Sequence, residues 1–444
     1  MNLMEKETNP VKSSGTDALR DHGTRNIVIL GAGFGGLTAV MQLGRLVKHQ
    51  KIADCEIILV DKNDYHTYTP TLYEVSTTSK EVADLIELKS IVTFPIHDML
   101  KNLPVRFIKD EVVSLDISPK GGDIHLKGGE HLRYDYLLIA LGSKTNYFNI
   151  PGLQESALEL KTFTDAIRVR EMIWEAVLGS EKTQNINVVV GGGGSTGVEL
   201  AGELRSWLNE LDSIHRNRTH VSIVEANPTV LFGFDTRVVE KVTARLKKIG
   251  VNLELNTKIK SVSPDKKILT EDGRAIPYDV FIWSGGVMGN PILNTIPLKV
   301  VKGRAEVTEQ MACLPQTPDL ELFGMVYAIG DIVCVMNSKS GKPVPMVARA
   351  AITQAKVAAE NIICDLMEKP HTKYNMPMEY PYVIPVGAKF AVAKIGPFII
   401  SGFFGWIFKG LIELYYLSSI MPISQAIGTW FRGLRIFIQN DRLG

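Results

Sequence analysis

The sequence Asn26-Ile-Val-Ile-Leu-Gly-Ala-Gly-Phe-Gly-Gly36 decides the fold of this chain. Its first five residues form a short apolar run that predicts a buried strand, and its glycines predict a tight turn. Residues 37–48 have the spacing of an amphipathic helix, and a second apolar run, Glu56-Ile-Ile-Leu-Val60, ends at Asp61. A strand, a glycine turn, a helix and a strand that ends in an acid together make a complete βαβ nucleotide-binding unit.

The same order of elements occurs a second time. Apolar residues 185–190 lead into Gly191-Gly-Gly-Gly-Ser-Thr-Gly197, residues 198–208 continue as a helix, and the next strand, Val221-Ser-Ile-Val-Glu225, again ends in an acid. One glycine pattern alone is weak evidence, but two copies in full context predict an α/β protein with two Rossmann-like dinucleotide-binding domains.

Each glycine of the first loop has its own predicted task. Gly31 makes the tight turn, Gly33 lets the backbone approach a pyrophosphate, and Gly36 lets the helix pack close to the strand. The helix N-terminus offers free N–H donors to the diphosphate, and Asp61 accepts hydrogen bonds from the adenosine ribose. The corresponding residues of the second loop are Gly192, Gly194, Gly197 and Glu225. A carboxylate at Glu225 would repel a 2′-phosphate, which favours NADH over NADPH.

The second nucleotide unit is predicted to be inserted into the first. Two similar segments, residues 134–142 and 278–286, each contain Tyr-Asp, an apolar strand and then glycine. We expect each segment to end one domain and to lead into the other. Residues 326–331 add a strand that ends at Asp331. The expected divisions are a disordered arm (1–24), a discontinuous first dinucleotide-binding domain (25–150 and 290–380), a second dinucleotide-binding domain (151–289) and a C-terminal membrane-association region (381–444).

Composition excludes some other classes of protein. The 49 basic and 48 acidic residues nearly cancel, so we expect no nucleic-acid partner. The four cysteines are Cys55, Cys313, Cys334 and Cys364; they form no C-x-x-C pair and lack zinc-ligand spacing, so we predict no metal site.

Taken together, these residues resemble the two-dinucleotide-binding flavoproteins, and among them the type II NADH dehydrogenases (NADH:quinone oxidoreductases). The motifs that carry the resemblance are Gly31 to Leu37, Asp61 with Tyr65 to Pro70 and Leu72-Tyr73, Gly192 to Glu203, Trp283 to Val287, and Ala328 to Asp331. The resemblance runs from Asn26 to the apolar C-terminus.

The resemblance implies an FAD enzyme that does not pump protons, with FAD in the first dinucleotide-binding domain (25–150 and 290–380) and NADH in the second (151–289). NADH would pass a hydride to flavin N5, and two electrons would then pass to a membrane quinone. Asp331 would bond the FAD ribityl chain. The other positions that the resemblance assigns to cofactor binding are Phe34, Gly35, Lys62, Gly142, Thr196, Gly286 and Gly330.

Three residues are candidates for the catalytic centre. Glu199 lies in the first turns of the second helix, where it either approaches the nicotinamide or merely complements the helix dipole. A further helix is predicted near Pro345. Bacterial members of the family that the chain resembles usually carry Ala-Gln in the first turn of this helix, whereas this chain has Ala348-Arg349. That arginine either contacts the acceptor or reduced flavin, or pairs with a nearby carboxylate. Gln354 follows one turn later.

The sequence allows more than one role for His66 and Trp283. His66 either contacts FAD or is a surface histidine, and Trp283 either walls the cofactor crevice or is a core residue, which we favour. Glu203 shares the helix face of Glu199 and is interpreted as a structural carboxylate.

The C-terminus is predicted to lie on a membrane. Residues 397–421 are long enough to span, but Lys409 interrupts them and three glycines weaken a lone helix, so an amphipathic helix in the bilayer surface fits better. Because residues 1–24 lack a signal peptide, we expect the enzyme to lie peripherally on the cytoplasmic face of the cell membrane. A dimer interface or core helix is the alternative, and a homodimer stays possible. We expect a protein cut at Pro397 to leave the membrane with its flavin bound. The aromatic belt would comprise Phe403, Phe404, Trp406, Phe408, Tyr415, Tyr416, Trp430 and Phe431.

Three other functions are alternatives to NADH:quinone oxidoreduction. A sulfide:quinone oxidoreductase needs two redox cysteines at the flavin, and only Cys55 lies in the first half of the chain. Disulfide reductases lack support because there is no C-x-x-C. A membrane-attached flavoprotein scaffold or redox sensor, similar to apoptosis-inducing-factor-like proteins, would differ by its slow turnover.

Overall fold

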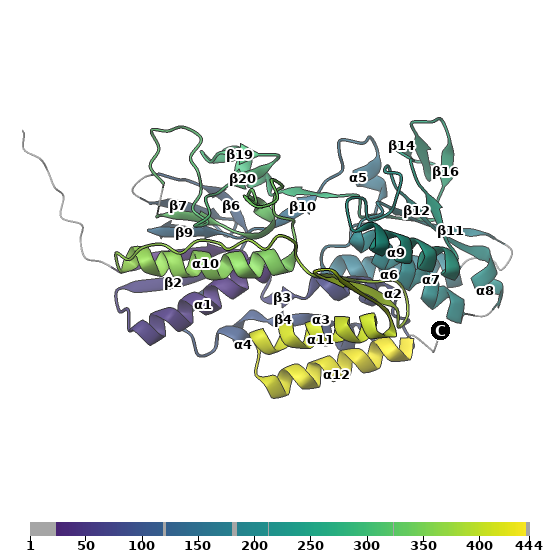
Figure 1. The fold of residues 1–444 in the computed structure, drawn as a ribbon, viewed down its shortest axis with the longest axis horizontal. Helices are drawn as coiled ribbons and strands as arrows, with labels where there is room; N and C mark the ends of the chain where they lie inside the picture. Colours follow the sequence, from purple (N-terminus) through teal and green to yellow (C-terminus); the bar gives the residue numbers. More distant parts are fainter. Residues whose placement is uncertain (1–23, 119–120, 180–183, 212, 323, 441–444) are drawn as a thin grey trace, which may run out of the picture.

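The computed structural model describes residues 24–118, 121–179, 184–211, 213–322 and 324–440. Most of the arm expected at residues 1–24 therefore lies outside the described part of the chain. Two parallel sheets with covering helices lie at opposite ends of the long axis, and the C-terminal helices run beneath them (Figure 1).

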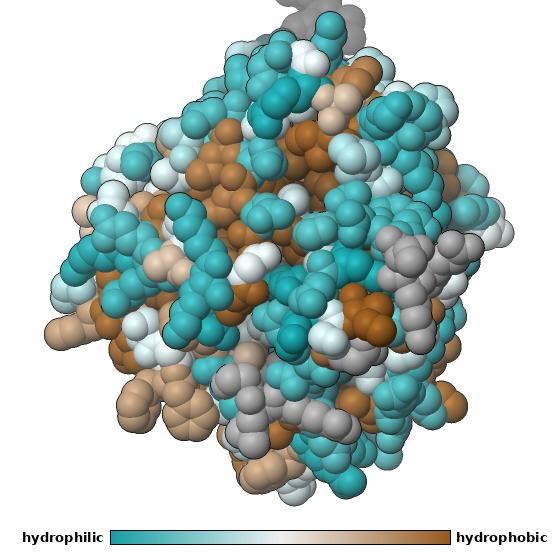
Figure 2. Space-filling view, turned by 90° about the vertical axis from the view of Figure 1, so that its right-hand side faces the viewer, coloured by the Kyte–Doolittle hydropathy of each residue, from teal (hydrophilic) through white to brown (hydrophobic). Residues whose placement is uncertain are grey.

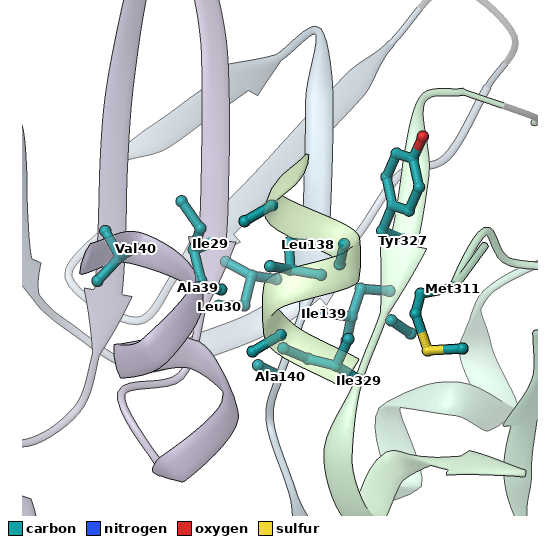
Figure 3. Packing of buried hydrophobic residues seen from close by; sticks show 14 of the residues in the cluster. Ile29, Leu30, Ala39, Val40, Leu138, Ile139, Ala140, Met311, Tyr327 and Ile329 are labelled. Atoms are coloured by element: carbon teal, nitrogen blue, oxygen red, sulfur yellow. The ribbon is translucent and has the colours of Figure 1, made fainter. Parts of the chain in front are cut away.

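The first sheet has five parallel strands in the order β21-β9-β1-β2-β5. Its strands come from both ends of the chain: Arg25–Leu30 (β1), Cys55–Asp61 (β2), Val105–Lys109 (β5), Tyr136–Ile139 (β9) and Val326–Ala328 (β21). Helices α1 (Phe34–Gln50) and α10 (Ala348–Leu366) pack side by side on it. Their small and branched side chains meet Leu30, Leu138 and Ile329 in a buried core (Figure 3).

The second sheet has four parallel strands in the order β13-β12-β11-β17. All of them lie between the fourth and fifth strands of the first sheet in sequence, as expected for an inserted unit. The strands and main helices are β11 (Ile186–Gly191), β12 (Thr219–Val224), β13 (Val251–Glu254), β17 (Val280–Trp283), α6 (Phe163–Leu178), α7 (Ser195–Glu210) and α9 (Thr236–Ile249).

Short antiparallel strands and helices surround these sheets. The pair β10 (Ser143–Thr145) and β18 (Val287–Gly289) joins the two segments that connect the halves. The remaining strands are β3 (Tyr65–Thr67), β4 (Thr93–Pro95), β6 (Val112–Leu115), β7 (Gly122–Leu126), β8 (His131–Tyr134), β14 (Ile259–Ser263), β15 (Lys267–Thr270), β16 (Ala275–Pro277), β19 (Val300–Val301), β20 (Arg304–Glu306) and β22 (Val333–Cys334). The remaining helices before residue 380 are α2 (Leu72–Thr77), α3 (Leu85–Val92), α4 (Ile96–Leu100), α5 (Leu153–Ser156) and α8 (Ser213–Arg218).

The C-terminal region corrects part of the sequence interpretation. The apolar stretch after Pro397 does not begin as a helix: Phe398–Gly402 is β25, which pairs with β24 (Ala391–Ile395) and through it with β23 (Tyr382–Pro385). Two helices follow, α11 (Phe403–Ile420) and α12 (Ile423–Asn440), and they pack against each other. Among the described residues, no helix combines the length and apolarity that crossing a bilayer requires.

Candidate functional site

The first glycine loop has the geometry of a phosphate cradle. A Cβ on Gly31 would lie 2.5 Å from the carbonyl oxygen of Ala140, and one on Gly36 would lie 1.7 Å from that of Gly31, so both positions require glycine. Gly33, by contrast, faces open space, and no side chain caps the helix that starts after it. The free N–H donors and the dipole of α1 can therefore receive a diphosphate.

The second loop repeats this geometry. A Cβ on Gly192 would meet Gly285 at 2.5 Å, and one on Gly197 would lie 2.0 Å from the carbonyl oxygen of Gly192. Gly194 faces open space at the uncapped start of α7. Both halves of the molecule therefore fit the pyrophosphate of a dinucleotide.

The two strand-end acids have matching hydrogen bonds. Asp61 accepts the backbone N–H groups of Ala32 (2.7 Å) and Asn63 (2.8 Å), and burial raises the pKa of its carboxyl. Glu225 accepts those of Gly193 (2.6 Å) and Asn227 (2.7 Å). Each carboxylate is thus held beside its glycine loop with lone pairs left for a ribose.

Sequence reasoning missed how the first loop is supported from behind. The Nδ1–H of His66 donates to the carbonyl of Ala32 (2.9 Å), and Nε2 accepts from the Tyr416 hydroxyl on α11 (2.7 Å). Burial lowers the pKa of His66 to about 4, so the ring is neutral at pH 7. The surface interpretation of His66 is therefore wrong. Tyr68 stacks on Tyr416, and Phe34 packs against both rings.

Asp331 lies between the two halves of the chain, in a polar contact with residues far away in sequence. The Ser143 hydroxyl donates to Asp331 (3.0 Å), and Lys161 donates to Ser143 (2.9 Å). Gln354 does not line the cavity that Arg349 borders: it is buried, and its side-chain oxygen accepts the backbone N–H of Gly330 (2.8 Å). Gln354 thus positions the turn before Asp331, which is a different role from the catalytic one predicted.

A cavity of about 1390 Å³ connects the starts of three helices. Phe34 borders it from α1, Glu199 from α7 and Arg349 from α10. Residues Ile412, Tyr415 and Tyr416 close it from the C-terminal helix α11. Two of the three predicted catalytic residues therefore share one space, and that space also adjoins both glycine-loop helices.

A buried cluster of charged groups adjoins this cavity. Lys409 pairs with Glu74 (2.6 Å) and lies near the ring of Tyr73. Burial raises the pKa of Glu199 to about 8, and Lys409 opposes that rise only in part. Burial likewise raises the pKa of Glu413 to about 7. The placement of Lys409 at a membrane surface was wrong, because the lysine points inward to this cluster.

The other predicted site residues are placed as follows. Arg349 is exposed, and among the described residues it forms no ion pair, so the carboxylate-pair alternative does not hold. Trp283 is a core residue whose ring N–H donates to Asn146 (2.8 Å), which confirms the interpretation favoured from sequence. Gly35 is buried against Ile329 and Ala351, and Glu203 is also buried, whereas Lys62 and Thr196 are exposed. Gly142 and Gly330 have positive φ, and Gly286 lies beside Phe148.

Neither cysteines nor metal ligands gather at the cavity in the described part of the chain. The four cysteines are unpaired, and none borders the cavity. Cys313 and Cys334 are buried, and burial raises the pKa of the Cys313 thiol. Among the described residues, no group of His, Cys, Asp and Glu side chains is arranged to hold a metal ion.

The chain is similar to several known proteins. The family model "Pyridine nucleotide-disulphide oxidoreductase" matches residues 25–355. A type II NADH:quinone oxidoreductase of Haemophilus influenzae is 29% identical over 79% of this chain and 83% of its own length. The protein of the same name from Staphylococcus aureus is 27% identical over 76% and 82%. The solved structure of NDH2 from Plasmodium falciparum with NADH has a TM-score of 0.76 at 19% identity, covering 95% of this chain and 99% of that one.

Proposed function

Because the chain belongs to the pyridine nucleotide-disulphide oxidoreductase family, we propose that it is an FAD-dependent type II NADH:quinone oxidoreductase. The observation that carries the proposal is the single cavity bordered by the starts of α1, α7 and α10 and by the C-terminal helix α11. A hydride donor bound at the second loop and an acceptor entering beside α11 would both reach this space. Relatives named for this activity match over 79% and 76% of this chain.

The residues present fit FAD in the first half and NADH in the second. We assign residues 25–150 and 290–380 to FAD and residues 151–289 to NADH. FAD, when bound, supplies a centre that takes a hydride at N5 and returns two electrons to a quinone. Gly33 and the start of α1 would hold its diphosphate, Asp61 its adenosine ribose and Asp331 its ribityl chain. The positive end of α10 would favour negative charge at the flavin's pyrimidine edge.

Glu225 supports NADH as the electron donor. Its carboxylate is fixed by Gly193 and Asn227, so it stays beside the loop and would meet the 2′ position of a bound adenosine. A free hydroxyl can donate to it, whereas a 2′-phosphate would be repelled.

The charged cluster supports a source for the second proton of the reaction. NADH brings one proton with its hydride, and reduction of quinone to quinol consumes one more. Glu199 borders the cavity, and its raised pKa of about 8 keeps a proton on its carboxyl at pH 7. Lys409 would stabilise the Glu199 carboxylate once that proton leaves, whereas the negative charge of its partner Glu74 disfavours that carboxylate.

The exposed face of the C-terminal helices supports peripheral attachment to a bilayer, which we assign to the cytoplasmic face of the cell membrane. Phe404 is 72% exposed, Tyr415 65% and Phe431 58%. Apolar side chains protrude along the lower margin of Figure 2, at the height where α11 and α12 lie in Figure 1. Exposed aromatic and aliphatic side chains of this kind suit headgroup depth. Tyr416 does not belong to the belt predicted from sequence, because it is buried against His66.

A donor comparison tests the proposed function. Purified protein with bound FAD and a soluble naphthoquinone should oxidise NADH at turnover speed and should leave sulfide unoxidised. Slow NADH oxidation with fast sulfide oxidation would overturn the proposal in favour of sulfide:quinone chemistry. Slow turnover with both donors would favour a redox scaffold.

A further inference from the structure

The cavity that joins the helix starts has an uneven charge along its border. Arg45 on α1, Lys342 before α10, and Arg349 and Lys356 on α10 all line it. In the described part of the chain, none of these four side chains takes part in a salt bridge. Because α1 and α10 pack side by side, the cations of the two helices border the same opening.

The acids on the same border do not compensate these cations. Glu379 is paired with Lys394, and Glu199 holds its proton at pH 7 because burial raises its pKa to about 8. The fifth cation, Lys409, is paired with Glu74. Four cations on the border of the cavity, all of them exposed, therefore have no salt-bridge partner among the described residues. Much of its remaining lining is apolar, including Phe34, Met41, Val344, Ile352, Ile412 and Ile420.

A neutral quinone would offer no charged group to these four side chains. A cleft lined by charges of one sign attracts ligands of the opposite charge and raises their local concentration. Arginine offers a planar set of donors that matches two oxygens of a carboxylate or sulfonate. Arg349 also lies in the first turn of α10, where the helix dipole adds positive potential.

We propose that this cavity selects electron acceptors that carry an acidic group next to an aromatic quinone ring. The ring would lie among the apolar side chains, and its acidic group would lie against Arg349 and Lys356. This inference rests on the proposed function, since it names the acceptor class of the same site. The reaction is unchanged: two electrons and two protons convert the quinone to the quinol, and the acidic group takes no part.

Two acceptors that differ in charge test the proposal kinetically. The ratio of kcat/KM for 1,4-naphthoquinone-2-sulfonate to that for 2-methyl-1,4-naphthoquinone is measured in the wild type, Arg349→Gln and Lys356→Gln. Comparing ratios between proteins cancels the difference in reduction potential between the two quinones. Each substitution should lower the ratio by about threefold to tenfold, because a charge-assisted contact is lost. Raising the ionic strength should lower the wild-type ratio as well.

Lys48→Gln is the matched control. Lys48 lies one turn beyond Arg45 on α1 and is exposed, but it does not border the cavity. Its substitution should leave the ratio unchanged. An equal fall in Lys48→Gln and Lys356→Gln, or an unchanged ratio in both cavity variants, would overturn the inference.

A binding measurement separates this inference from the proposed function. Naphthalene-2-sulfonate cannot be reduced as a quinone, so equilibrium dialysis measures its affinity for the FAD-bound protein without turnover. Weaker binding to Arg349→Gln than to Lys48→Gln supports the anion site even if no quinone is reduced. Equal binding to both variants rejects it, even if NADH:quinone turnover is fast.

Discussion

In the first glycine loop the carbonyl of Ala32 accepts a hydrogen bond from the side chain of His66, whereas in the second loop the matching carbonyl of Gly193 accepts one from the backbone of Leu231. His66 in turn binds Tyr416, which lies 350 positions away in the chain. The second loop is therefore completed within its own unit, while the first is completed by the C-terminal helix α11. Two copies of one fold thus differ in what they need from the rest of the molecule.

The largest effects are expected when one glycine is substituted in each loop separately, which tests whether the two loops bind different dinucleotides. In Gly36→Ala the new Cβ would lie 1.7 Å from the Gly31 carbonyl oxygen, and in Gly197→Ala it would lie 2.0 Å from that of Gly192. We expect Gly36→Ala to be purified without FAD and Gly197→Ala to keep FAD but lose reduction by NADH. Flavin absorbance before and after NADH addition measures both.

Gly428→Ala serves as the control, because a Cβ at that helix position meets no atom within 4 Å. It should keep both functions. A Gly36→Ala protein with full flavin content would show that the first loop does not hold FAD.

Removing the C-terminal region from Pro397 onward should have the next largest effect. The cut removes β25, the Tyr416 contact to His66 and the Lys409 pair with Glu74. We therefore expect loss of FAD together with loss of membrane binding, which replaces the sequence-based expectation that flavin would stay bound. NADH binding, measured by nicotinamide fluorescence, should persist. A truncated protein that still holds stoichiometric flavin would contradict the dependence of the first loop on this region.

Glu225, the acid beside the second loop, should control the choice between NADH and NADPH without affecting FAD binding at the first loop. Glu225→Arg removes the carboxylate that would repel a 2′-phosphate and adds a cation that would attract it. The NADH/NADPH ratio of kcat/KM should fall by about tenfold or more. Flavin content, measured by absorbance, should stay at the wild-type level. An unchanged ratio would remove Glu225 from the ribose site.

Corresponding positions after the two loops also differ in chemistry. Thr38 follows Gly36 by two residues, Glu199 follows Gly197 by two, and both border the cavity. Because the pKa of Glu199 is raised to about 8, its proton is present below pH 8 and is lost as pH rises through that value. Quinone reduction should therefore decline above about pH 8 in the wild type and should be slower but flat in Glu199→Gln. A matching alkaline decline in the variant would assign the proton to another group.

The smallest expected effect comes from one hydroxyl. Tyr416→Phe leaves the buried Nε2 of His66 without a donor, which should cost about 1–3 kcal/mol of stability and weaken FAD retention. Tyr415→Phe is the matched control, since that neighbouring tyrosine is 65% exposed. Thermal unfolding and flavin release compare the two. Equal changes in both proteins would mean that the His66 link does not support the first loop.

Local sequence patterns were sufficient to predict the two nucleotide-binding units. They were insufficient to predict the contacts that the C-terminal helix α11 makes with the rest of the chain. Strand, glycine turn, helix and acid are adjacent in sequence, so Gly31, Asp61, Gly192 and Glu225 could be placed from the sequence alone. The contact from His66 to Tyr416 and the pair of Glu74 with Lys409 join residues more than 300 positions apart, and no periodicity encodes such pairs. An apolar run after Pro397 fits a strand or a helix equally, and only pairing with β24 decided its first part.

The most direct measurement follows the two half-reactions separately under anaerobic conditions. NADH is mixed with the FAD-bound protein while flavin absorbance is recorded, and a naphthoquinone is then added. The account predicts rapid bleaching by NADH and recovery by the quinone, both at rates no slower than steady-state turnover. Bleaching without recovery would contradict the claim that one cavity serves both the hydride donor and the quinone.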